Sequence, residues 1–127
     1  MRTRFLIPIA LAVLAGGVHA QSNGPSASAE LAPAPQRYLV EREIPGASRM
    51  PLEEFQQGAA KSNATLRLMG PDIQWVQSYV AGDKVYCIYQ APSEAMIREH
   101  AARAGFPANR ITPIARVIDP TTASPRR

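Results

Sequence analysis

Alternating polar and apolar residues in 73–89 predict a β-hairpin. Gly82 and Asp83 lie between the two strands, and Gly supplies the positive φ that a two-residue loop needs. Pairing across this loop places Trp75 opposite Gln90, and alternation along each strand then gives two faces. One face is small and aliphatic: Val76, Ser78, Val80, Val85 and Cys87. The other is aromatic and polar: Trp75, Gln77, Tyr79, Tyr86, Ile88 and Gln90.

The segments on either side of the hairpin predict two helices and two further strands. A strand covers 37–44, a helix with apolar residues three and four apart covers 51–69, and a second helix covers 93–105. The last strand, 110–118, contains Pro113 and is expected at a sheet edge. This order is that of a ferredoxin-like βαββαβ sandwich, an α+β fold with a four-stranded antiparallel sheet and both helices on one face.

The other side of the sheet is left open, and it carries the aromatic side of the hairpin. Of the two alternating sets in the first strand, we expect Leu39, Glu41 and Glu43 to point to this open face, because Val40 suits the core. Aromatic residues are enriched at protein interfaces, so we expect a homodimer whose two sheets close into a dimeric α/β barrel. Within the first helix, Gly58 costs up to about 1 kcal/mol against Ala, which suggests close packing there.

The N-terminus has the pattern of an export signal. Arg2 and Arg4 precede an apolar run, and a small-residue motif predicts cleavage after Ala20. We therefore expect a signal peptide at 1–20, a flexible linker at 21–36, the ferredoxin-like domain at 37–120 and a disordered tail at 121–127. The expected location is the periplasm or the medium, with no membrane association after cleavage.

Composition excludes some function classes. Cleavage would leave twelve basic residues against ten acidic ones, and no Lys/Arg cluster lies on a helix face, so we expect no nucleic-acid partner. Cys87 is the only cysteine, which excludes an intrachain disulfide and favours a small buried side chain. His100 would be the only histidine left after cleavage, at the margin of a buried helix face. It could be a metal ligand or a boundary histidine hydrogen-bonded to the backbone or an acid.

Glu41 and Glu43 share one face of a central strand. Two such carboxylates can bind a metal, act as acid and base, or simply form salt bridges. The candidate metal ligands are therefore Glu41, Glu43 and His100, and the candidate ligand or interface residues are Trp75, Gln77, Tyr79 and Tyr86. No nucleophile and base occur at a recognisable spacing, so no catalytic residue is assigned.

Several short motifs resemble one family of small ferredoxin-like proteins that is associated with nickel. They include Tyr38–Arg42, Gly70-Pro71, Ser78–Val80, Tyr86-Cys87, Glu99–Ala101, Ala104–Pro107 and Ile118–Thr121. The resemblance spans 37–121 and implies the ferredoxin-like fold, a dimer, and binding of nickel or another divalent transition metal. The chain departs from the family pattern at Gln77, where many members carry His.

The sequence thus predicts an exported, non-catalytic protein that binds a transition metal or a small ligand. Two alternatives stay open. One is a dimeric α/β-barrel enzyme with Glu41 or His100 as acid/base, and the other is a module that serves only assembly.

Overall fold

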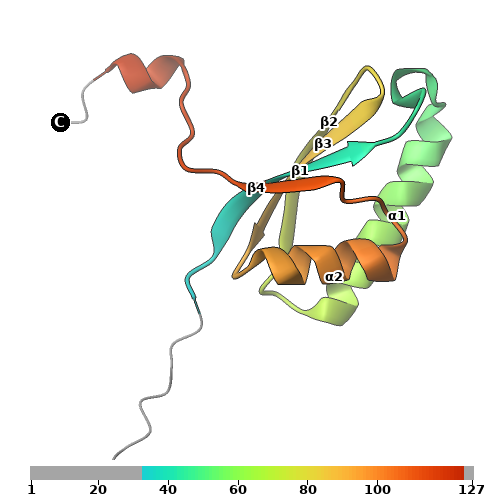
Figure 1. Cartoon of the computed structure of the whole chain (residues 1–127), viewed down its shortest axis with the longest axis horizontal. Helices are drawn as coiled ribbons and strands as arrows, with labels where there is room; N and C mark the ends of the chain where they lie inside the picture. The colour runs from blue at the N-terminus through green and yellow to red at the C-terminus, as the bar shows by residue number, and fades with distance from the viewer. Residues whose placement is uncertain (1–32, 125–127) are drawn as a thin grey trace, which may run out of the picture. The chain divides into compact units, whose positions relative to one another are not determined.

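Four strands form one antiparallel sheet in the order β2-β3-β1-β4. The computed structural model describes residues 33–124. Its main elements are β1 (Gln36–Glu43), α1 (Leu52–Met69), β2 (Gln74–Ala81), β3 (Lys84–Ala91), α2 (Glu94–Ala104) and β4 (Arg110–Pro113). Both helices lie on one side of the sheet (Figure 1). This is the predicted ferredoxin-like βαββαβ sandwich.

The core lies between the sheet and the two helices. On β1 the buried residues are Tyr38, Val40 and Arg42, so Leu39, Glu41 and Glu43 face the other way, as predicted. On β3, Cys87 is buried on the helix-facing side, which confirms the prediction of a core side chain. The remaining buried apolar residues include Val85, Tyr89, Ala91, Ile97, Ala101, Ala104 and Ile111.

The hairpin turn is fastened to the loop that follows β1. Gly82 has φ 59°, whereas Asp83 has a negative φ. A positive φ at only the first of the two loop residues is the pattern of a type II′ turn. The amide of Ile44 donates to the Asp83 carbonyl at 2.9 Å, and the amide of Gly46 donates to the Asp83 carboxylate at 2.8 Å. Ser48 donates to the Gly82 carbonyl from both its amide and its hydroxyl. These bonds fix where the chain leaves the sheet and enters α1.

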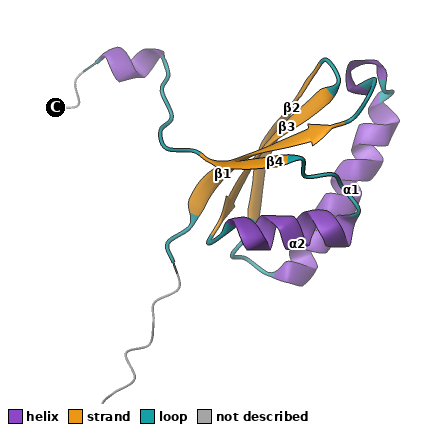
Figure 2. Cartoon of the chain, in the orientation of Figure 1, coloured by secondary structure: helices purple, strands orange, loops and turns teal. Residues whose placement is uncertain are grey.

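The C-terminal part differs from the prediction in two ways. The last strand ends at Pro113, not at Ile118, because proline has no amide hydrogen to donate to the neighbouring strand. One further hydrogen bond follows it, from the Ile114 amide to the Arg37 carbonyl of β1. Its position at the sheet edge is confirmed. After a loop (Figure 2), the described part of the tail forms a 3₁₀ helix, Pro120–Ala123, capped by the Asp119 side chain, where we had expected disorder.

The predictions for 1–20 and for most of the linker lie outside the described residues. Within 33–124, none of the helices combines the length and the apolar character that crossing a membrane requires.

The inner face of α1 is looser than its sequence suggests. Leu52, the first apolar residue of this helix, is 66% exposed, and a Cβ added at Gly58 would meet no atom of a neighbouring element within 4 Å. The prediction of close packing at Gly58 is therefore wrong. The glycine sits where the helix stands away from its neighbours, and nothing there requires its small size.

Replacement of Gly58 by Ala should accordingly raise the free energy of unfolding by about 0.5–1 kcal/mol, because Ala loses less backbone entropy in a helix. Urea denaturation measures this change. Gly82→Ala is the matched control and should lower stability by about 1 kcal/mol, since its φ of 59° disfavours a side chain. A loss of stability in Gly58→Ala would contradict the open space at this position.

Candidate functional site

A β-bulge changes the face on which Trp75 lies. The register shifts between Trp75 and Gln77, so Trp75 pairs with Tyr89 and not with Gln90 as predicted. The indole consequently lies on the helix-facing side, where its Nε1 donates to the Ser78 hydroxyl at 2.8 Å. Val76, the extra residue of the bulge, is 44% exposed where we had expected it in the core. Alternation alone could not reveal this, because a bulge inverts it locally.

The open face keeps the other predicted residues. It consists of Leu39, Glu41, Glu43, Gln77, Tyr79, Tyr86 and Ile88. On β2 the Gln77 amide donates to the Tyr79 hydroxyl two residues along the strand. Tyr79 is 56% exposed, so an aromatic side chain remains uncovered in the single chain. The open face is thus an amphipathic surface available to a partner.

Glu41 is the most constrained carboxylate of the open face. Its oxygens lie 3.2 Å from Lys84 Nζ and 3.8 Å from Arg110 Nε, and its side chain is only 18% exposed. The hydrogen bond to Glu41, with its charge, raises the pKa of Lys84. Glu43 is exposed and lies opposite Lys84 in the β1–β3 register. A cation binding here would have to compete with Lys84 for Glu41.

His100 lies on the opposite side of the sheet. It is fully buried, not at a margin, and its Nε2 lies 3.2 Å from the Ser62 hydroxyl of α1. Its ring is 5.2 Å from that of Tyr89, and within the described chain its Nδ1 has no hydrogen-bond partner. The sheet therefore separates His100 from Glu41, so the two candidate acid–base residues do not meet in the single chain.

The three candidate metal ligands are divided in the same way. Glu41 and Glu43 share the open face, whereas His100 is in the core. Among residues 33–124 no group of three or more His, Cys, Asp or Glu side chains is placed to hold a metal ion. Imidazole is the side chain that suits nickel best here, and the one imidazole described is packed away from both carboxylates. The described part of a single chain does not fit a nickel site.

Sequence reasoning missed the role of Arg42. This residue belongs to the buried set of β1 and is 4% exposed, although it carries a charge. It lines a cavity of about 520 Å³ between α1 and the helix-facing side of the sheet, which we call the α1 cavity. The sequence did contain a signal for its burial: Tyr38, Val40 and Arg42 are spaced two residues apart, so on a strand they point to the same face.

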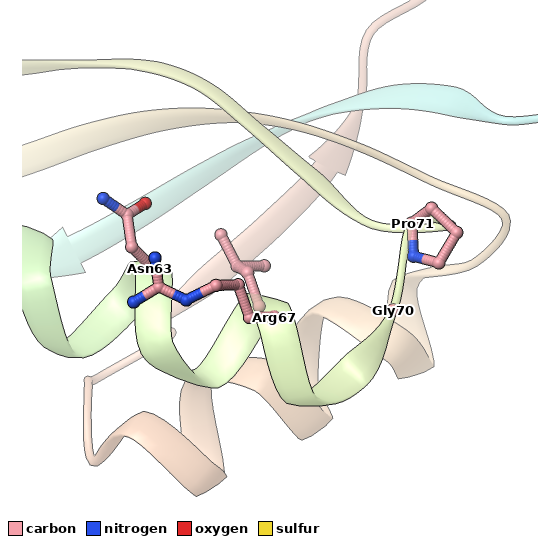
Figure 3. A pocket seen from close by; sticks show the side chains of 5 residues that line it. Asn63, Arg67, Gly70 and Pro71 are labelled. Atoms are coloured by element: carbon pink, nitrogen blue, oxygen red, sulfur yellow. The ribbon is translucent and has the colours of Figure 1, made fainter.

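A second hollow, of about 440 Å³, lies at the C-terminal end of α1. Figure 3 shows Asn63 and Arg67 on the same side of that helix, with Gly70 and Pro71 in the segment that follows. Asn63, Arg67 and Pro71 are exposed, and only Leu66 and Gly70 of its lining residues are partly buried. It therefore has the features of an ordinary surface depression.

The fold and the divided faces define a ferredoxin-like α+β protein with one covered and one open sheet face. The family described as "Nickel responsive protein SCO4226-like" matches residues 38–114, and the chain belongs to this family. A solved structure with the same fold is that of SCO4226 from Streptomyces coelicolor A3(2), with a TM-score of 0.55 and 18% identity. The match covers 65% of this chain and 99% of SCO4226. A search of curated proteins finds no match.

Burial gives His100 a measurable effect on stability. Burial, with the charge of Arg42 as a smaller cause, lowers the pKa of His100 below its usual 6.5. Below pH 6.5 the unfolded chain therefore binds a proton that the folded protein does not. The free energy of unfolding should fall as the pH decreases through this range, by at most about 1.4 kcal/mol per pH unit.

Urea denaturation between pH 7.5 and 5 measures the slope. His100→Gln is neutral at every pH and should reduce that slope, whatever its effect on stability at pH 7.5. Equal slopes in the two proteins would contradict the lowered pKa, because they would show that His100 binds its proton over the same pH range in the folded and unfolded states.

Proposed function

We propose that this protein is an exported, non-catalytic binding protein that forms a homodimer through its open face and binds a divalent transition metal there. The observation that carries the proposal is the open face itself. It combines two carboxylates, Glu41 and Glu43, with an uncovered aromatic side chain, Tyr79, while both helices cover the other side. The leader pattern of residues 1–20 supports export.

The apolar side chains of the open face support dimerisation, because a single chain leaves them without a covering layer. Leu39, Tyr79, Tyr86 and Ile88 form an apolar area on two central and one edge strand. In a two-fold dimer the same patch meets itself, so the apolar residues of both chains would be buried together. Two sheets that pack in this way close into an α/β barrel with the carboxylates inside.

Metal binding depends on the dimer, because one chain does not supply enough ligands. Two protomers would bring two copies of Glu41 and two of Glu43 to the shared interior. Nickel is the metal suggested by the family description. Carboxylates suit nickel less well than imidazole does, and Lys84 already neutralises Glu41, so we expect modest affinity.

The dimer can be tested with Tyr79→Glu. A charge at this position should convert the dimer to a monomer, because burying it without a partner costs several kcal/mol. Size-exclusion chromatography with light scattering gives the molecular mass. Leu68→Glu is the control: Leu68 is 83% exposed on α1, and its replacement should leave the dimer intact. A wild-type protein that is monomeric at high concentration would refute the proposal.

Metal binding can be tested by calorimetric titration with nickel, copper and zinc. We expect nickel to bind more tightly than about 1 mM, or −4 kcal/mol, with one site per dimer. The double variant Glu41→Gln and Glu43→Gln should abolish the binding. Glu53→Gln with Glu54→Gln removes the same charge from α1 and should not affect it.

The two tests also separate the alternatives. A dimer that binds none of the three metals would leave assembly as the function of the open face. A monomer that still binds nickel would place the metal somewhere other than the shared interior.

A further inference from the structure

The α1 cavity has the size and lining of a small-molecule site. Its volume of about 520 Å³ lies within the roughly 300–1,000 Å³ that is usual for such sites. Phe55, Trp75, Val80 and Val85 contribute apolar surface to its walls. From α1 the lining includes Gly58, where an added Cβ would meet nothing within 4 Å. The cavity therefore has open space beside Gly58.

Of the two charged residues that line the cavity, Arg42 is the buried one. Its Nε donates to the Cys87 thiol sulfur at 3.4 Å, and its Nη1 donates to the Pro107 carbonyl. The guanidinium carbon of Arg42 lies 5.3 Å from the ring centroid of Phe106 and 5.9 Å from that of Tyr89. Within the described chain, Nη2 is buried without a hydrogen-bond partner. The guanidinium is thus held in place with one nitrogen still free to donate.

No carboxylate compensates this charge. The ion pairs formed within residues 33–124 involve Lys84, Arg98, Arg103 and Arg110, and not Arg42. Glu54 also lines the cavity, but it is exposed in the first turn of α1 and makes no ion pair with Arg42. A buried charge is costly unless it is paired, and guanidinium is suited to bind a carboxylate through its N–H groups.

From this combination we propose that the α1 cavity binds a small amphipathic carboxylate. The carboxylate neutralises the charge of Arg42, which lines the cavity and has no carboxylate partner within residues 33–124, and the apolar part of the ligand lies along Trp75 and Val85. An unbranched monocarboxylic acid of medium length has this chemistry. The site lies on the helix-facing side of the sheet, so it is independent of the open face and of the proposed metal.

Trp75 is the only tryptophan of the chain and lines the cavity, so its fluorescence reports binding directly. Titration with octanoate should change the emission saturably, with a Kd below about 1 mM. 1-Octanol, which has the same apolar chain and no charge, should bind at least about tenfold more weakly, a difference of 1.4 kcal/mol.

Arg42→Met keeps the length of the side chain and removes its charge. It should weaken octanoate binding by at least about tenfold and leave the affinity for 1-octanol within about twofold. Arg98→Met removes an exposed charge of α2 and serves as the control. Equal affinities of the wild type for octanoate and 1-octanol, or unchanged octanoate binding in Arg42→Met, would overturn the proposal.

A second variant tests the location without touching the charge. Gly58→Leu should fill the cavity from α1 and abolish the octanoate response, while the better helix propensity of leucine maintains the fold. Ala60→Leu places the same side chain on the exposed side of α1 and should bind octanoate like the wild type. If Gly58→Leu binds octanoate normally, or if the wild type shows no saturable response, the cavity is not the site.

Discussion

The burial of the Arg42 charge is the constraint on which the arrangement of this domain depends. The guanidinium joins β1 to the Cys87 thiol of β3 and to the Pro107 carbonyl after α2, and two aromatic rings lie beside it. A buried cation needs such compensation, because removing it from water costs several kcal/mol. The centre of the domain is therefore built around a polar group, and α1 lies above a cavity on that side instead of closing tightly onto the sheet.

Alternate side chains of β1 point to opposite faces of the sheet, so the sheet separates the buried cation from the carboxylates. Arg42 points toward the helices, while its neighbours Glu41 and Glu43 point to the open face. His100 and Cys87 lie on the side of Arg42, so the groups with the best metal-binding nitrogen and sulfur are kept from the carboxylates. Membership in the nickel-responsive family is consistent with the fold, while the candidate ligands described in this chain lie on opposite sides of the sheet. The fold and the site are thus determined by different residues.

Much of the fold could be predicted because its signals are local. The Gly82 turn, the Ser93 cap of α2, the glycine that ends this helix at residue 105, and Pro113 at the edge each act within a few residues. The site was predicted less well. Tyr79 and Glu41 lie on the open face as expected, whereas Trp75 does not, and His100 is deeper than its position on the helix suggested. A bulge and the depth of a side chain depend on neighbours that are distant in sequence.

The sequence by itself therefore determined the element order, the family and the two-faced character of the sheet, because strand period, turns and caps are set by adjacent residues. The tertiary structure decided which chemical groups meet. Only packing against α1 and α2 showed that His100 is buried beside Ser62 and Tyr89, and that the buried Arg42 lines a cavity. The hydrogen bonds of His100 to Ser62 and of Arg42 to Cys87 and Pro107 join residues about 40 to 65 positions apart, and no local pattern specifies the distance between them.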